Sequence, residues 1–351
     1  MSPGTLAAAP FSAGPLSAGP LSAAPGTSGS IASFTLWAVT VAALLVLLVV
    51  DIVLTRRPHE VRMREAVGWS VFYLVLPVLF GFYLWAAYDG GVAVEFFTGW
   101  VVEKSLSVDN LFVFMLLLAA FAVPAELAQR VLLYGIVGAL VLRAIFIALG
   151  AAALESGTWA FLLFGAVLIL TAGKVLREAR KGEAHAVDID SMRSVRLLRR
   201  LVPVSPRYQG FRLVVRENGR TAITPLALAT VAVFATDIVF AVDSVPAVYG
   251  VTDDPFLVFA TNAFALLGLR ALYFVLRGAL ARLRHLNYGL AIILAFIGVK
   301  LVLHWAHGIW AWVPEIPTPA SLGVIVTVLF TVTVTSLRAE RVPPPPKENE
   351  A

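Results

Sequence analysis

Long apolar segments separated by short polar stretches dominate the chain from residue 31 to residue 337. A helix of about 20 residues crosses a hydrocarbon core of about 30 Å, and apolar runs of that length recur throughout this region. The pattern therefore predicts an all-α polytopic membrane protein with about nine transmembrane helices. We expect them at residues 31–55, 69–88, 95–121, 127–152, 158–177, 225–250, 255–279, 286–307 and 318–337.

The two ends of the chain differ from this apolar region. Residues 1–30 repeat small residues with Pro and Gly and lack the basic and apolar segments of a signal peptide, which predicts a disordered low-complexity tail. Residues 341–351 are expected to form a short C-terminal tail. A transmembrane transporter domain should therefore cover residues 31–340, with a basic loop at residues 178–220.

Lysine and arginine occur in alternate connections between the predicted helices. The connections YDGGVAVE, LESGT, GVTDDP and HGIWAWVPEIPTP contain neither residue, whereas the intervening ones carry arginines. Because basic loops stay on the cytoplasmic side, we expect the N-terminus outside and the C-terminus in the cytoplasm. An odd number of helices agrees with this orientation in a bacterial inner (plasma) membrane.

The basic loop at residues 178–220 allows two interpretations. Met192, Val195 and Leu198 alternate with arginines at helical spacing. This pattern is typical of an amphipathic helix that lies on anionic lipid. An ordinary positively charged cytoplasmic loop is the simpler alternative.

The composition of the chain limits the class of protein and the partners that we expect. Hydrophobic residues make up 59% of the chain and charged residues 14%, whereas a soluble domain carries roughly 25% charged residues. The net charge of +5 lies in the loops, so we expect the lipid bilayer, and no nucleic acid, as a partner. With no cysteine, no phosphate-binding loop and no hydrolase motif, the chain is not expected to be an enzyme.

Two acidic segments of the chain resemble each other. VEKSLSVDNLF in the third predicted helix aligns with TDIVFAVDSVP in the sixth. The alignment places Glu103 on Asp237 and Asp109 on Asp243, and in each segment the second acid follows the first by six positions. These matches indicate an internal repeat of transmembrane helices.

Basic residues extend the repeat into the following helices. LVLRAIF around Arg143 matches LGLRALY around Arg270, and the next helices carry Lys174 and Lys300 at corresponding places. Helices 3–5 and 6–8 are thus two copies of a three-helix unit. Because three is odd, the second copy must be inverted in the membrane, and such 3+3 inverted repeats place a binding site at their interface near the midplane.

Acidic side chains inside a membrane are expensive, at about 2.5–3.5 kcal/mol each on insertion scales. On an ideal helix the two acids of one segment lie about 120° apart. One acid of each pair would then face the site while the other faces a lysine or arginine. Alternatively, the helices are broken locally near Ser105, Ser107 and Pro246, and freed carbonyls help to bind a cation.

The candidate ligands all carry oxygen, which suits Mn²⁺, Mg²⁺ or Ca²⁺. A competing interpretation is that the acids only neutralise buried basic residues, or that the lysines near the helix ends extend to the membrane surface. The predicted metal ligands are Asp109, Asp243, Glu103, Asp237, Asn110 and Ser244. The residues expected beside them, as supporting groups or counter-charges, are Arg143, Arg270, Lys104, Lys174, Lys300 and Asn262.

VEKSLSVDNLFVF and TDIVFAVDSVPAVYGVTDDPFLVFATNAFALLGLRALYF closely resemble the TerC family, the tellurium-resistance-associated integral membrane proteins. The resemblance covers roughly residues 70–310. It implies a lysine-exporter-like fold with two inverted three-helix repeats, and manganese export or metal homeostasis. The positions of the family's acidic motif map onto Glu103, Asp109, Asn110, Asp237, Asp243 and Ser244. Without cysteine, nothing in the chain indicates tellurite chemistry.

The sequence therefore predicts a secondary transporter that exports Mn²⁺ through Asp109 and Asp243, assisted by Glu103 and Asp237. Manganese would be the substrate, and no cofactor is expected. An exporter of another small solute, such as an amino acid, is one alternative. A membrane-embedded assembly factor, working through the basic loop, is another, and homo-oligomers or membrane partner proteins stay open.

Overall fold

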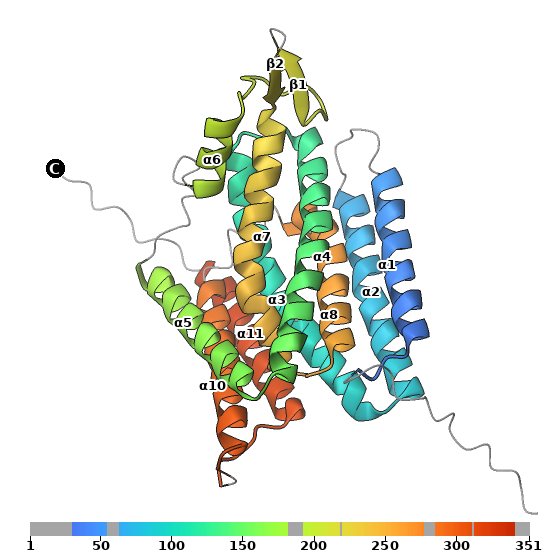
Figure 1. The fold of residues 1–351 in the computed structure, drawn as a ribbon, viewed down its shortest axis with the longest axis vertical. Helices are drawn as coiled ribbons and strands as arrows, with labels where there is room; N and C mark the ends of the chain where they lie inside the picture. The colour runs from blue at the N-terminus through green and yellow to red at the C-terminus, as the bar shows by residue number, and fades with distance from the viewer. Residues whose placement is uncertain are drawn as a thin grey trace, which may run out of the picture.

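The computed structural model describes residues 30–54, 63–181, 192–217, 220–276, 285–310 and 312–340. This part of the chain forms eleven helices and one two-stranded sheet (Figure 1). The predicted tails fall outside it, apart from Ser30. The helices are α1 (Phe34–Leu54), α2 (Met63–Ala87), α3 (Gly90–Ala120), α4 (Ala125–Glu155), α5 (Trp159–Lys181), α6 (Arg193–Leu201), α7 (Pro225–Tyr249), α8 (Pro255–Leu267), α9 (Leu269–Leu276), α10 (Leu286–His307) and α11 (Thr318–Glu340), and the strands are β1 (Val214–Glu217) and β2 (Arg220–Ile223).

Among the described helices, eight candidate spans are long and apolar enough to cross a membrane, α8 and α9 together forming one of them. The helix α3 is 31 residues long but is not among them. It carries four charged residues: Glu95, Glu103, Lys104 and Asp109. With α3 included, the structure confirms an all-α polytopic architecture whose spans lie where the apolar pattern predicts them.

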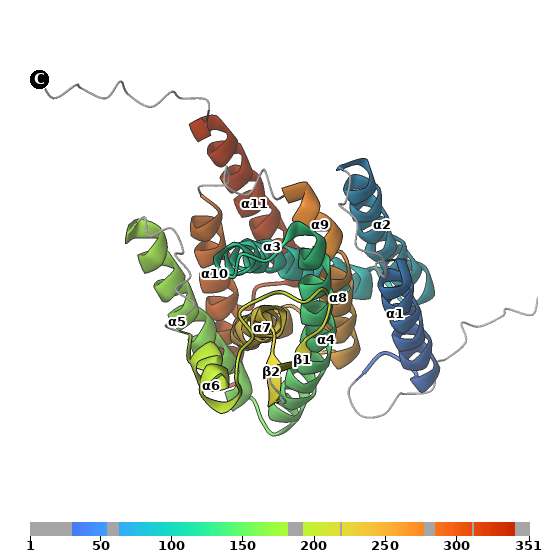
Figure 2. The same cartoon turned by 90° about the horizontal axis from the view of Figure 1, so that it is seen from above.

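The two copies of the three-helix unit pack against each other as inverted repeats should. The unit α3–α4–α5 corresponds to α7–α8/α9–α10, and α3 and α7 run in opposite directions through the bundle (Figure 1). Within the bundle α3 packs on α8, α4 packs on α7, and α5 packs on α10. If each helix is replaced by its counterpart in the other copy, the contact of α3 with α8 becomes that of α7 with α4, and the contact of α5 with α10 stays the same. Figure 2 shows α3 and α7 inside this arrangement, with α1 and α2 to one side.

The contact between α5 and α10 depends on two glycines. A Cβ atom added at Gly165 would lie 2.8 Å from the carbonyl oxygen of Gly298, and one added at Gly298 would lie 3.0 Å from that of Gly165. Small residues let transmembrane helices approach until their backbones touch. The equivalent helices of the two copies therefore meet backbone to backbone at this point.

The basic loop forms a small cap at one end of the bundle, here called the upper end, where β1 pairs antiparallel with β2 (Figure 1). The predicted amphipathic helix exists as α6, but its apolar face packs on protein. Val195 is buried against the same core cluster as Ile223, with Met192 and Leu198 beside it. The interpretation of this face as a lipid-binding surface is therefore wrong, because the end of α7 covers it.

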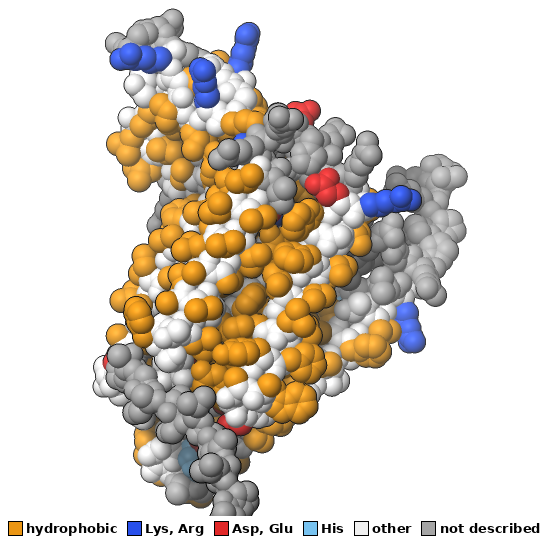
Figure 3. All heavy atoms as spheres, turned by 90° about the vertical axis from the view of Figure 1, so that its right-hand side faces the viewer, with side chains coloured by type: hydrophobic (Ala, Val, Ile, Leu, Met, Phe, Trp, Pro, Cys, Tyr) orange, Lys and Arg blue, Asp and Glu red, His pale blue; other side chains and the backbone are white. Residues whose placement is uncertain are grey.

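The outer surface of the bundle matches a lipid environment. In Figure 3, hydrophobic side chains cover most of the middle of one face, while Lys and Arg side chains lie at its edges. Many of these large apolar side chains are exposed, for example Leu79 at 60% and Leu170 at 74%. Exposure on this scale is expected where lipid, and not water, is the solvent.

The helices are not broken at the positions that the sequence predicts, and one interruption lies elsewhere. α3 runs without interruption past Ser105 and Ser107, and α7 continues through Pro246. The Ser105 hydroxyl donates to the carbonyl of Val102 in its own helix at 2.7 Å. The hypothesis of local breaks at these positions is therefore wrong; the interruption lies at Gly268, between α8 and α9.

Candidate functional site

A buried ionic cluster, hereafter the Arg143 cluster, lies where four helices of the two copies meet. Arg143 of α4 forms an ion pair with Glu103 of α3 through Nη1. Its Nη2 lies 3.4 Å from Oδ1 of Asp237 in α7. Nη1 also donates to Oδ1 of Asn262 in α8 at 2.7 Å. All four side chains are almost completely buried.

Local hydrogen bonds orient these groups. The Asn262 amide donates from Nδ2 to the carbonyl of Val258 one turn earlier, at 2.9 Å, which leaves Oδ1 facing Arg143. The Ser107 hydroxyl lies one turn from Glu103 in α3 and donates to its Oε1 at 3.5 Å. Asn262 and Glu103 are thus held by their own helices as well as by Arg143.

The Arg143 cluster contains more acid than base. With Glu103 and Asp237 ionised and Arg143 protonated, its formal charge is −1. Several buried polar atoms of the region have no hydrogen-bond partner among the described residues; they are Glu103 Oε2, Asp237 Oδ2, Arg143 Nε, Asn110 Nδ2 and Ser244 Oγ. Buried polar groups in native proteins nearly always have a partner. The charge and the free oxygens together fit a bound proton, water or cation.

The second acid of each segment behaves differently from the first. Asp243 is half-buried, and Arg143 and Glu103 both act on its carboxyl group electrostatically. Its neighbour Ser244 is buried. Asp109 belongs to α3, but its side chain lies outside the described part of the structure. Among the described residues, no group of three or more Asp, Glu or His side chains is arranged to hold a metal ion.

Arg270 is not part of the Arg143 cluster. It forms a buried ion pair with Asp51 of α1, next to Tyr73. The described carboxylate partner of Arg270 therefore comes from outside the repeat, and its role as a counter-charge for Asp109 stays a prediction, because that side chain lies outside the described structure. Asp51 was missed, although a single acid inside the apolar run of α1 is a visible signal.

None of the three lysines forms an ion pair with the Arg143 cluster in the described structure, although Glu103 acts electrostatically on its neighbour Lys104. Lys104 donates to the carbonyl of Ala265 at 3.2 Å, beside the interruption between α8 and α9. Lys174 is exposed, and Nζ lies 3.9 Å from Oε1 of Glu178 one turn later in the same helix. Lys300 faces a separate cavity. The predicted role of Lys174 and Lys300 beside the acids is wrong, since both lie toward the helix ends.

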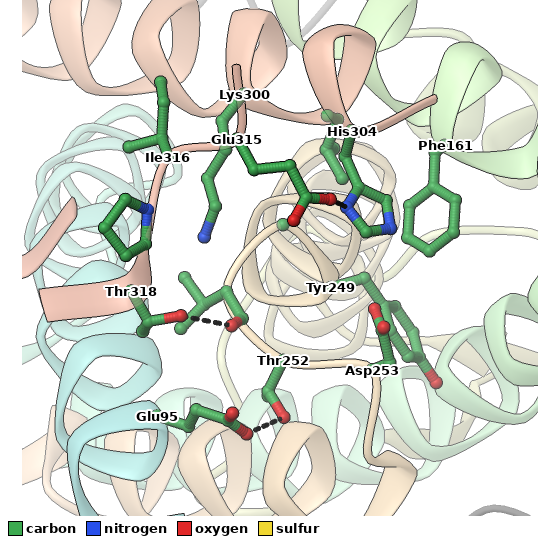
Figure 4. Close-up of a pocket in the computed structure, with 14 residues that line it drawn as sticks. Glu95, Phe161, Tyr249, Thr252, Asp253, Lys300, His304, Glu315, Ile316 and Thr318 are labelled. Carbon is green, nitrogen blue, oxygen red and sulfur yellow. Dashed lines mark hydrogen bonds and ion pairs between the residues drawn. The ribbon is translucent and has the colours of Figure 1, made fainter. Parts of the chain in front are cut away.

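That separate cavity lies at the lower end of the bundle, opposite the cap, and measures about 490 Å³. Its charged lining residues are Glu95, Asp253, Lys300, His304 and Glu315. His304 Nδ1 lies 2.8 Å from Oε1 of Glu315, and the Thr252 hydroxyl donates to Glu95 at 2.7 Å (Figure 4). The sequence did not predict this cavity, because its lining residues come from separate parts of the chain.

The fold and the buried charges define the class of the protein: a polytopic integral membrane protein with ionisable groups at the interface of two inverted repeats. Residues 88–343 match the family described as integral membrane protein TerC family. The chain belongs to this family, and the sequence resemblance is confirmed.

Several relatives cover most of the chain. An "Uncharacterized membrane protein" of Myxococcus xanthus is 39% identical over 313 residues, 89% of this chain and 95% of that protein. A second protein of that description, from Mycobacterium tuberculosis, is 41% identical over 88% of this chain and 81% of its own length. The Escherichia coli protein named "Putative membrane-bound redox modulator Alx" is 39% identical over 84% of this chain and 91% of its own length. No solved structure matches the chain significantly.

Proposed function

We propose that this protein is a secondary transporter that moves a divalent metal cation, with manganese as the expected cargo, through a site formed by Asp109 and Asp243 beside the Arg143 cluster. One observation carries the proposal: two carboxylates and one guanidinium are buried together where the inverted repeats meet. Intramembrane ionisable residues mark ion pathways in transporters, and inverted repeats place such sites at their interface.

The arrangement assigns different tasks to the acids. Glu103 and Asp237 are held by Arg143, whereas Asp243 is half-buried and free to receive a cation. With Asp109 from the matching position of α3, Asp243 would supply the cation ligands. When the cation has left, Arg143 would compensate one of the remaining acids, and bound protons would have to compensate the others.

Hard oxygen ligands support a hard divalent cation as cargo. The acids, Asn110 and Ser244 offer oxygen, and the chain has no cysteine to provide a soft thiolate ligand. The name of the Escherichia coli relative points to redox modulation. Because this chain lacks cysteine, it has no thiol–disulfide couple of its own, which favours ion transport over thiol chemistry.

The orientation belongs to the same proposal. The upper end carries the arginines of α6 and of the neighbouring loop, so the positive-inside rule places it in the cytoplasm of a bacterial inner membrane. The cavity at the lower end would then open outward. Carboxylates that exchange the cation for protons would couple export to the proton gradient.

A growth assay tests this function. In a manganese-sensitive deletion strain, the wild-type chain should restore growth in manganese, while Asp243→Asn and Asp109→Asn should not. Glu155→Gln, at an exposed carboxylate of α4, is the matched control and should complement fully. Equal complementation by all variants would contradict the assignment of Asp109 and Asp243 as cation ligands.

The same assay separates the main alternative, an assembly factor that works through the cap. α6 exposes Leu197 and Leu201 on adjacent turns, at 59% and 70% exposure. If the double variant Leu197→Ser/Leu201→Ser abolishes complementation while Asp243→Asn retains it, partner handling replaces transport as the function. The transporter proposal predicts the opposite result.

A further inference from the structure

The cavity at the lower end, hereafter the acidic vestibule, brings together charges from distant parts of the chain. Glu95 comes from the start of α3, Asp253 from the α7–α8 connection, Lys300 from α10 and Glu315 from the segment before α11. Three carboxylates thus face one lysine in a cavity of about 490 Å³. None of these residues belongs to the Arg143 cluster.

Lys300 points into the vestibule without a direct partner (Figure 4). Asp253, Glu95 and Glu315 all act on its ammonium group electrostatically. No described residue forms a hydrogen bond or an ion pair with it, in contrast to Lys174, its counterpart in the other copy, which pairs with Glu178. The Lys300 ammonium therefore occupies an acidic space without being fixed to one carboxylate.

The carboxylates suit a cation that keeps its water shell. Glu95 already accepts from Thr252, and Glu315 pairs with His304. No three acidic or histidine side chains in the described structure can coordinate one ion directly. A divalent cation with six waters needs about 200 Å³ at the volume that water has in the liquid, which the vestibule can hold. Small divalent cations lose their waters reluctantly.

We propose that the acidic vestibule binds a hydrated divalent cation through its water shell, and that Lys300 is a tethered cation that competes for the same carboxylates. Binding in the vestibule is independent of transport. Its role in export rests on the proposed function: Lys300 would replace the departing ion and so favour its release.

An exchange-inert probe tests this directly. Hexaamminecobalt(III) cannot accept a carboxylate ligand, so it binds only where a hydrated ion is held through its shell. Calorimetric titration into the purified full-length protein should show binding that is weakened at least about tenfold by Glu95→Gln/Asp253→Asn, since two attractive charges are removed. Lys300→Gln should tighten binding about three- to tenfold, because a competing charge is lost.

Two variants control the titration. Lys174→Gln removes the same charge from the matching place in the other copy and should leave the affinity unchanged. Lys300→Arg keeps the charge and should bind the probe as the wild type does. Absence of probe binding, or an equal effect of Lys174→Gln and Lys300→Gln, would overturn the proposal.

The outcome is separable from that of the transport proposal. Asp243→Asn should abolish manganese export and leave probe binding intact. If the probe fails to bind while manganese export persists, the vestibule proposal falls and the transport function stands. If the probe binds with the predicted pattern but neither Asp109→Asn nor Asp243→Asn affects export, the vestibule proposal stands and the transport proposal falls.

Discussion

Arg143 and Arg270 occupy matching positions in the two copies of the three-helix unit, yet they have different partners. Arg143 joins an acid from each copy, whereas Arg270 pairs with Asp51 of α1, outside the repeat. The scaffold is duplicated, but the charges are not used symmetrically. A single arginine therefore holds the central acids, and the other secures α1 to the bundle.

The residues around the two arginines explain part of this asymmetry. Counting from the aligned arginines, Gly135 matches Asn262, and Val141 matches Gly268. Asn262 supplies a hydrogen-bond acceptor to Arg143, which Gly135 cannot do for Arg270. Gly268 interrupts the helix in the second copy, whereas α4 is continuous through Val141. Small differences in side chain thus give the copies different roles.

The largest expected effect comes from removing Arg143. Arg143→Gln would leave Glu103 and Asp237 buried without their counter-charge, which costs about 3–5 kcal/mol of unfolding free energy. Thermal unfolding of the purified protein in detergent would measure the loss. Arg270→Gln removes the matching charge and should cost less, since Arg270 is more exposed, at 8% against 1%.

A compensated variant sharpens that comparison. Arg143→Gln combined with Glu103→Gln and Asp237→Asn removes the acids as well, so much of the lost stability should return. If Arg270→Gln proves as costly as Arg143→Gln, or if compensation fails, the contrast between the two arginines is not electrostatic.

The next effect concerns the contact that both copies share. Gly165→Ala places a Cβ atom 2.8 Å from the backbone of α10, and overpacking of this kind costs about 1–3 kcal/mol. Gly173→Ala lies in the same helix with nothing within 4 Å of the added atom, and serves as the control. A similar unfolding temperature for the two variants would argue against backbone contact between α5 and α10.

A loss of similar size is expected at Asn262, the polar residue that lacks a counterpart in the first copy. Asn262→Ala removes one acceptor from Arg143 while both ion pairs stay in place, and should cost about 1–3 kcal/mol. Asn262→Gln keeps a neutral amide acceptor and serves as the comparison. If alanine and glutamine destabilise equally, Asn262 acts through packing and not through Arg143.

The orientation of the protein in the membrane can be tested with single cysteines, because the chain has no cysteine of its own. Substitutions at exposed positions should have almost no effect on stability. Ser156→Cys lies in the connection after α4, at the end opposite the cap, and Gln209→Cys lies within the cap; both positions are exposed. A membrane-impermeant thiol reagent added to intact cells should label the first and not the second. The reverse pattern would place the vestibule in the cytoplasm and contradict the proposed direction of export.

Much of the fold follows from local pattern. Apolar run length places the nine spans, and the matched pairs Glu103/Asp237 and Arg143/Arg270 reveal the repeat. The expectation that one acid of each segment faces a basic residue agrees with the position of Arg143. These features depend on side chains within one helix or on a comparison of two similar segments.

The remaining features depend on contacts between distant segments. Nothing near Arg270 in the sequence indicates that Asp51, 219 residues away, is its partner. The carboxylates and the lysine of the vestibule likewise come from four separate segments, so no single motif predicts it. Charged residues can be located from the sequence, but which of them meet depends on helix packing.

Manganese flux into proteoliposomes tests the central claim, transport through a site that Asp243 helps to form beside the Arg143 cluster, most directly. Purified wild-type protein and the Glu155→Gln control should carry Mn²⁺ at equal rates, while Asp243→Asn, with an unchanged unfolding temperature, should reduce the flux to that of empty liposomes. A stable Asp243→Asn variant that transports Mn²⁺ at the wild-type rate would contradict the account.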